Sequence, residues 1–332
     1  MFTITDFDPF KADEYTWEEY FDFCKIVAGN YLTKDEFIEW VKEGLKGSDN
    51  KFKLIYRDNI LIVAMMSFSK KGVSGNKIPF IALESTINEP SKELSKSIAN
   101  AMMQLMTGNP IRSFRISTAN ALIREIITGF HGTIINTKNF YQLYRNQLNE
   151  VVMNEWRVNR YMESGELTLA IHEHIPENLH DQFAVLLTGL MNDIIREDSQ
   201  EYFTETGERV KQKMELLKKS RVKMLTLMLF DLQHQLIGVS FIQVFPNSVT
   251  AKQYMTGIKN QYRGKKLASY LKAIITEEAF RRFPDIEKIE TDCYDANKPM
   301  IHINEVIGYK LKDITLQFNV EVENVEKFLA AG

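Results

Sequence analysis

The sequence has few of the residues and segments that define several large classes of protein. Only Cys24 and Cys293 are present in 332 residues, and they lie far apart. We therefore predict buried thiols, with no disulfide framework and no cysteine metal site. No apolar run reaches the about 18 residues of a membrane helix, and residues 1–15 are acidic and aromatic, unlike a signal peptide. We expect a cytoplasmic protein that does not act at a membrane.

The sequence also lacks an excess of charge of one sign. It has 41 basic and 44 acidic residues, so no global electrostatic attraction to nucleic acid is expected. The basic cluster of Arg263, Lys265 and Lys266 has neither an aromatic platform nor a wider basic face, and we predict no nucleic-acid partner. Hydrophobic residues, in contrast, make up 44% of the chain. A chain of this length and composition is typical of a globular protein with two domains.

Both halves of the sequence show a similar order of expected elements. Each half has a hairpin of apolar strands, the first turning at Asp58-Asn59 and the second at 231–235. The other elements expected in the first half are helices before residue 45, strand 78–87, helix 91–106, strand 111–117, helix 120–129, and short strands near 133–135 and 140–148. Those expected in the second half are strand 167–175, helices 176–195 and 206–220, and the hairpin strands 222–230 and 236–245. We interpret this order as an internal duplication, with domains at 1–155 and 156–332.

The stretch 254–283 has the composition of an anion site. A short strand at 254–258 is followed by a basic turn at 259–266, and then by a helix whose apolar residues recur at the helical period. A helix N-terminus presents unpaired backbone N–H groups and a partial positive charge, which together favour a phosphate. The corresponding loop of the first half, 88–93, has two acids and no glycine. The first copy is therefore predicted to be degenerate.

Two common phosphate loops, GxxxxGK[ST] and GxGxxG, are absent from this turn. The turn instead resembles the acetyl-CoA loop of the GNAT N-acetyltransferases, whose pattern is Q/R-x-x-G-x-G/A. Gln261 and Gly264 match that pattern, and Lys266 stands where Gly or Ala is expected. Downstream, Asn297 with Met300, and Asn304-Glu305 with Gly308-Tyr309, resemble the N-x-x-M and N-E-x-x-G-[FY] ending of the same family.

The resemblance implies an α+β (α/β) fold class with two tandem GNAT-like domains. Each domain is expected to have a mixed, mostly antiparallel central sheet flanked by helices. The strands at 254–258 and 288–294 are expected to splay apart at the CoA site. Acetyl-CoA is the implied co-substrate, and no metal is expected. The residues implied to bind acetyl-CoA are Met255, Thr256 and Ile258 along the pantetheine arm, Gln261, Tyr262, Arg263, Gly264, Lys265, Lys266, Leu267 and Ala268 around the pyrophosphate, and Asn297 on the arm.

The resemblance also implies direct transfer of the acetyl group to a primary amine of a small molecule. Many members of the family use a Tyr as the acid, and here that position is Asn304. The proton for the departing thiolate is therefore expected from Tyr294 or His302, or the thiolate leaves unaided. Glu290 and Asp292 share one face of their strand and are the candidate bases.

The sequence leaves several alternatives open. Asn304 and Lys266 also suit a non-catalytic acyl-CoA-binding sensor or regulatory module. The segment 196–207, acidic through Glu197, Asp198, Glu201 and Glu205, favours a cationic acceptor no more than a solvated loop. His172 and His174 share a strand face, but no third ligand accompanies them, so a metal site is not expected. The protein is expected to be a monomer whose two copies form a pseudo-dimer, or a homodimer.

Overall fold

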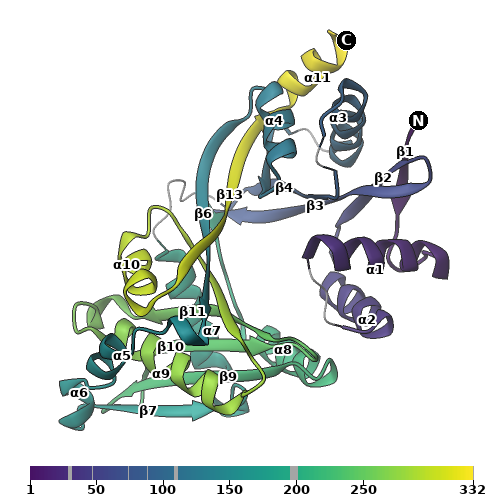
Figure 1. Ribbon diagram of the computed structural model, residues 1–332. Coiled ribbons are helices and arrows are strands. Elements are labelled where there is room, and N and C mark those ends of the chain that lie inside the picture. Colours follow the sequence, from purple (N-terminus) through teal and green to yellow (C-terminus); the bar gives the residue numbers. More distant parts are fainter. Residues whose placement is uncertain are drawn as a thin grey trace. The chain divides into compact units, whose positions relative to one another are not determined.

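The computed structural model describes residues 1–28, 32–46, 48–73, 75–87, 89–107, 111–194 and 201–331. The chain forms two compact units (Figure 1). Unit 1 consists of Met1–Lys138, Glu197–Tyr202 and Ile314–Gly332, and unit 2 consists of Asn139–Arg196 and Phe203–Asp313. Each unit therefore takes segments from both halves of the sequence. The predicted boundary at 155/156 concerns the two copies of a duplication, and it stays a prediction.

Unit 1 is a mixed sheet with helices on both faces. Its strands follow the order β1-β2-β3-β4-β5-β13-β6, in which β4 and β5 are parallel and the pairs from β1 to β4 and between β5 and β13 are antiparallel. The strands are β1 (Phe2–Phe7), β2 (Lys51–Arg57), β3 (Ile60–Gly72), β4 (Lys77–Ser85), β5 (Ser113–Thr118), β6 (Thr133–Tyr144) and β13 (Lys310–Glu321), and β8 (Glu201–Tyr202) pairs with the end of β3. The helices are α1 (Glu14–Ala28), α2 (Lys34–Leu45), α3 (Lys92–Met106), α4 (Ala121–Gly129) and α11 (Val322–Ala330).

Alternation along the strands of unit 1 divides its core into two layers. Leu54 and Ala64 pack with the aromatic side chains of α1 and α2, whereas their neighbours Ile55 and Val63 pack with α3 and α4. The predicted hairpin at Asp58-Asn59 is confirmed, because both residues adopt the left-handed conformation, with φ of 51° and 66°, that a two-residue turn requires.

Unit 2 has strands in the order β7-β9-β10-β11-β12-β6. Those not yet introduced are β7 (Leu167–His172), β9 (Lys223–Asp231), β10 (Leu236–Val244), β11 (Thr250–Ile258) and β12 (Lys288–Tyr294). Its helices are α5 (Glu150–Trp156), α6 (Arg160–Glu163), α7 (His180–Asn192), α8 (Gly207–Lys219), α9 (Leu267–Arg282) and α10 (Lys298–Ile307). Within the residues that the structure describes, no helix combines the length and apolar character that a membrane crossing needs.

Helices α9 and α7 contact opposite faces of the unit 2 sheet. Ile242 belongs to the same core as Leu271 of α9, whereas its neighbour Phe241 packs on Phe183 of α7. Successive strand residues point to opposite faces, so the two helices lie on different sides. The predicted elements of this region are confirmed, including the helix after the basic turn and the strand at 288–294.

The sequence prediction was wrong at β6 and missed other elements. The two short strands expected near 133–135 and 140–148 are one strand, Thr133–Tyr144. Strands β1 and β13 and helices α5, α6 and α11 were not predicted. The polar residues in β6 and β13 account for part of this failure, since several of them are buried and partnered only within the folded unit: Asn136 donates to Gln317, and Asn139 donates to Asp295 at 3.0 Å.

Candidate functional site

The parallel strands β11 and β12 pair for only part of their length. Pairing runs from Thr250 with Lys288 to Gln253 with Thr291, while β11 continues to Ile258 and β12 to Tyr294. The predicted splay of these two strands is therefore present. Beyond Gln253, the edge of β11 that faces β12 is left for another group to use.

A β-bulge in β11 lies where this pairing ends. Met255 opposes Phe241 of β10 and Gln253 opposes Ile242, which leaves Tyr254 as the extra residue. A bulge bends its strand and increases the local twist. The bend therefore accounts for the departure of β11 from β12 after Gln253.

The basic turn after β11 is fastened to neighbouring elements by side chains. Tyr262 donates from its hydroxyl to Asp231 at 2.7 Å, and this bond lowers the pKa of Asp231. The guanidinium of Arg263 donates to Ile258 O at 3.1 Å and pairs with Asp193 at 2.9 Å. Arg263 was implied to bind phosphate, but in this structure it braces the turn.

The two lysines of the turn remain near the start of α9. The backbone carbonyl of Lys265 accepts from Asn159 at 3.1 Å, and its ammonium lies 4.5 Å from the Tyr161 ring. The side chain of Lys266 is 79% exposed and reaches Glu155 only at 4.0 Å. An exposed ion pair of that length contributes little, so Lys266 is available to an anion.

The N-terminus of α9 has no side-chain cap. The residue before the helix, Lys266, is left-handed with φ of 57°, and Gly264 is left-handed with φ of 78°. In α3 of unit 1, by contrast, Ser91 caps the helix by accepting from Leu94 N at 3.0 Å. The first-turn N–H groups of α9 thus lack the acceptor that α3 supplies to itself, and this is the arrangement that binds phosphate in proteins.

The backbone of the turn also suggests a second way to place the acetyl-CoA pattern. Shifted by two residues, Q/R-x-x-G-x-G/A matches Arg263 and Ala268, and its first glycine falls on Lys266. Lys266 takes the left-handed conformation that a glycine adopts most easily. Both placements use the same segment, 261–268.

Asparagine residues at the start of α10 and α4 differ in their contacts. Asn297 accepts from Met300 N at 3.4 Å, and its amide N–H groups meet no acceptor among the described residues. Asn120, at the equivalent place in unit 1, accepts from Ile123 N and also donates to Ser85 O of β4 at 3.5 Å. Asn297 is thus available to a ligand, whereas Asn120 is bonded to its own sheet.

In the described register of β3 and β4, the corresponding strand pair of unit 1, there is no such bulge. The register between β3 and β4 runs without a shift from Val63 with Ser85 to Lys71 with Lys77. Of the loop 88–93, Asn88 lies outside the described residues, and Glu93 is in the first turn of α3. These features agree with the prediction that the first copy is degenerate, although they do not test ligand binding.

Two of the candidate catalytic residues on β12 are in different electrostatic surroundings. Glu290 accepts from Lys288 at 2.8 Å and from Lys312 at 2.9 Å. Burial favours a higher pKa for Glu290, but these two lysines outweigh it, and the net pKa is lowered. Asp292 is exposed on the same face. Since a base must accept a proton, the lowered pKa makes Glu290 less suited to that role.

The other two candidates, Tyr294 and His302, lie on different elements, β12 and α10. Tyr294 ends β12 on the face of Asp292, whereas His302 is exposed on α10, two residues before the fully buried Asn304. Two residues correspond to about 200° around a helix, so His302 points away from the buried side. Asn304 lies with its Nδ2 3.9 Å from Cys293 Sγ, and its Oδ1 is buried without a hydrogen bond.

A buried lysine below the parted strands was not predicted. Lys272 of α9 is 1% exposed, and its Nζ lies 4.6 Å from the centre of the Tyr309 ring. Burial lowers the pKa of Lys272 to about 7, and electrostatic interactions with Cys293 and Asp292 oppose this only in part. Its place in the apolar stripe, four residues after Ala268, was a sequence signal that went unused.

In the acidic segment at 196–207, the acidic side chains that the structure describes are paired within the protein. Glu197 and Asp198 lie outside the described residues. Glu201 and Glu205 are buried and ion-paired. Their partners are Arg115 and Lys70 for Glu201, and Arg209 and Lys213 for Glu205.

His172 and His174 do not form part of a metal cluster in the described structure. Among the residues described, no three His, Cys, Asp or Glu side chains gather as a metal site requires. Burial, with a smaller contribution from His174, lowers the pKa of His172. Cys24 and Cys293 are both thiols, and burial raises the pKa of Cys24 to about 11.

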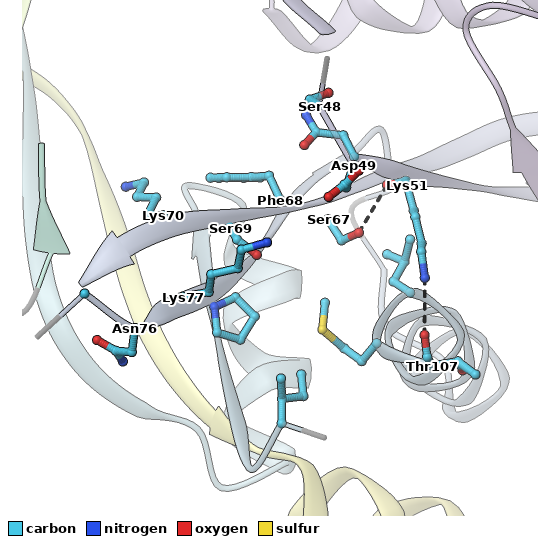
Figure 2. Close-up of a pocket in the computed structure, with 16 residues that line it drawn as sticks. Ser48, Asp49, Lys51, Ser67, Phe68, Ser69, Lys70, Asn76, Lys77 and Thr107 are labelled. Atoms are coloured by element: carbon cyan, nitrogen blue, oxygen red, sulfur yellow. Dashed lines mark hydrogen bonds between the residues drawn. The ribbon is translucent and has the colours of Figure 1, made fainter. Parts of the chain in front are cut away.

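A groove of about 1040 Å³ lies in unit 1, between the strand ends of β3 and β4 and the C-terminal end of α3 (Figure 2). Lys51 closes that helix end by donating to Thr107 O at 3.2 Å, and Asp49 also lines the groove. A helix C-terminus carries partial negative charge, which disfavours a pyrophosphate. The groove is therefore no counterpart of the turn before α9, which lies at a helix N-terminus.

No protein-family model and no curated protein sequence matches the chain. Solved structures do. A tandem GNAT protein from the clavulanic acid biosynthesis pathway is similar over 97% of this chain and 99% of its own, with a TM-score of 0.70 at 12% identity. A GCN5-related N-acetyltransferase from Sphaerobacter thermophilus follows, with a TM-score of 0.62 at 9% identity over 97% and 96% of the two chains. Saccharomyces cerevisiae N-myristoyltransferase with bound myristoyl-CoA reaches 0.54 at 10% identity, over 96% and 79%.

The chain therefore has the fold of the tandem GNAT N-acetyltransferases, as the sequence resemblance implied. At these identities the likeness concerns the fold. The chemistry has to be argued from the residues of this chain.

Replacing Gly264 by Val should weaken CoA binding by about tenfold or more. A residue with a Cβ at φ of 78° costs roughly 1–2 kcal/mol, so the turn is expected to change conformation and move its N–H donors. Gly165→Val is the matched control, since Gly165 has φ of 74° and, like Gly264, no atom within 4 Å of an added Cβ. Isothermal titration with CoA measures both. Parental affinity in Gly264→Val would show that the phosphate does not bind at this turn.

Replacing Lys272 by Met should remove a pH dependence of stability. The folded pKa of about 7 lies below the unfolded value of 10.5, so the unfolded chain binds more protons between these values. The free energy of unfolding of the parent should rise with pH from about 7 upward, relative to the variant, by at most about 1.4 kcal/mol per pH unit. Urea denaturation of both proteins at several pH values gives this difference. Parallel curves would mean that Lys272 stays charged in the fold.

Proposed function

We propose that the protein is an acyl-CoA-dependent N-acyltransferase that moves an acetyl group from acetyl-CoA to a primary amine of a small molecule by direct transfer. The observation that carries the proposal is the uncapped, left-handed start of α9 beside the parted strands β11 and β12. The start of α9 suits a pyrophosphate, and the open edge of β11 leaves backbone groups for the extended pantetheine arm of CoA. Two similar structures have acetyl-CoA or myristoyl-CoA in their names, which is said of those proteins and agrees with this class of co-substrate.

In this proposal the diphosphate binds at 261–268, with the backbone of the turn and Lys266 as its main partners. The pantetheine arm follows the open edge of β11, where Met255, Thr256 and Ile258 supply backbone groups. Asn297 donates its amide N–H groups to the arm. No metal takes part.

The acceptor enters as an ammonium ion and must lose one proton before its nitrogen can attack. Asp292, or a water held by it, takes that proton. The nitrogen then forms a bond to the thioester carbon while the carbon–sulfur bond breaks, and the nitrogen loses its second proton as the CoA thiolate gains one. The products are the N-acetyl amine and CoA with a free thiol.

The proton for the thiolate comes from Tyr294 in this scheme. Tyr294 ends the parted strand β12, whereas His302 lies on the exposed side of α10. Asn304 cannot give up a proton usefully, although it occupies the position of the tyrosine that many GNAT enzymes use. We place the reaction in the cytoplasm, in a monomer or a homodimer.

The alternative is a module that binds acyl-CoA and transfers nothing. The observation that favours it is the fully buried Asn304, where many enzymes of this fold have an acidic hydroxyl. Incubation with acetyl-CoA and a panel of amines distinguishes the two functions. The enzyme produces free CoA thiol only when an amine acceptor is present. The sensor binds acetyl-CoA and produces no free thiol with any amine.

CoA should bind once per chain. In unit 1, β3 and β4 pair without a bulge in their described register, α3 is capped by Ser91, and Asn120 is bonded to β4. Isothermal titration with acetyl-CoA should therefore give a stoichiometry near one, and Gly264→Val should weaken that binding by about tenfold or more. A stoichiometry near two would show that unit 1 also binds the co-substrate.

Replacing Tyr294 by Phe should lower kcat by roughly a hundredfold, because the thiolate then loses its proton donor. His302→Ala is the companion variant, and it should retain most of the parental kcat. Steady-state rates, measured with an amine that the parent acetylates, test both variants. A large fall in His302→Ala instead would assign the acid to His302, and near-parental rates in both would mean that the thiolate leaves unaided or takes its proton from water.

A further inference from the structure

An exposed aromatic platform lies beside the parted strands, on the sheet face opposite α9. Tyr254, the bulge residue, is 51% exposed, and its ring lies almost parallel to that of Phe241, with 6.2 Å between the centroids and 14° between the planes. Phe241 is held in turn by the buried Phe183 of α7, at 6.0 Å. Two stacked rings fixed from beneath make a surface for a flat or apolar group.

A carboxylate shares this face. Glu290 pairs with Lys252 in the register of β11 and β12, so Asp292, two residues on, lies on the face of Tyr254. Tyr254 and Asp292 also interact electrostatically. Burial raises the pKa of Tyr254 to about 12, and the charge of Asp292 adds to that rise. Asp292 is exposed.

We propose that Tyr254, Phe241 and Asp292 bind the acceptor and select a primary amine that carries an apolar or aromatic group and has no acidic group next to its nitrogen. The inference rests on the proposed function, whose acceptor it specifies. The ammonium group is attracted by Asp292 and by the face of the Tyr254 ring, and the apolar group packs on the two rings.

The same residues disfavour other amines. A carboxylate beside the nitrogen would lie close to Asp292, and like charges at such distances repel. A sugar amine would place hydroxyl groups against the rings, where they lose hydrogen bonds to water without gaining others. This face of the sheet therefore disfavours amines that carry an acidic group beside the nitrogen, and it also disfavours amines whose remaining part is polar.

Three amines separate these two effects. Ethylamine, phenethylamine and phenylalanine differ by one ring and then by one carboxylate, and their kcat/KM values are compared per neutral amine. Phenethylamine should exceed ethylamine by about tenfold or more, which is the range that packing an added apolar group gives, and it should exceed phenylalanine, whose carboxylate is repelled by Asp292, by a similar factor.

Variants assign each effect to a residue. Tyr254→Ala should reduce the advantage of phenethylamine over ethylamine to about threefold or less, mainly through KM, and Tyr254→Phe, which keeps the ring, should retain that advantage. Asp292→Asn should reduce the advantage of phenethylamine over phenylalanine, whatever it does to kcat itself. The comparison of ratios keeps selection separate from any role of Asp292 as a base.

Titration of each variant with acetyl-CoA checks that the fold and the co-substrate site are intact. Equal kcat/KM for the three amines, or a preference that Tyr254→Ala leaves unchanged, would overturn the inference while the proposed function stands. If the parent binds acetyl-CoA but acetylates no amine at all, the proposed function itself fails, and the inference fails with it.

Discussion

The end of pairing between β11 and β12 is the constraint on which the rest of the site depends. One extra residue, Tyr254, produces it, and the same residue changes the side-chain alternation of β11. Gln253 and Thr256, three residues apart, share the α9 face and are hydrogen-bonded at 3.0 Å, while Tyr254 points to the opposite face. A single bulge therefore leaves the strand edge open, places a polar pair beneath it, and presents an aromatic ring on the other side.

The two copies of the duplication show what happens to the same layout without that residue. In unit 1 the register between β3 and β4 is continuous, the helix that follows β4 is capped by Ser91, and the asparagine that begins α4 bonds to β4. Each of these features satisfies within the chain a backbone or amide group that unit 2 leaves for a ligand. Buried or helix-end polar groups are costly when unsatisfied, so a copy without a ligand gains stability by bonding them internally. The differences are thus consistent with one another, since each of them stabilises the fold of unit 1.

Most of the architecture could be predicted from local signals. The left-handed pair Asp58-Asn59, the period of the helix after Lys266 and the apolar strands of both hairpins depend on neighbouring residues alone. Strand β6 could not be predicted in this way, because Asn136 and Asn139 at its centre are typical of a turn in sequence. Both are buried, and both are satisfied by residues more than 150 positions away. A polar run becomes a strand only when such distant partners exist, and local patterns do not contain them.

The same limit applies to the candidate site, where residue types alone do not define the surroundings of each charge. Arg263 was expected at the phosphate, yet Asp193, 70 residues away, holds its guanidinium. Glu290 was a candidate base, yet Lys312 from the next strand lowers its pKa together with Lys288. Lys272 had no role predicted from the sequence, yet in the folded protein its amine lies against the Tyr309 ring. A charged side chain acts on a ligand only if its own protein leaves it unsatisfied, and that depends on long-range contacts, which only the fold decides.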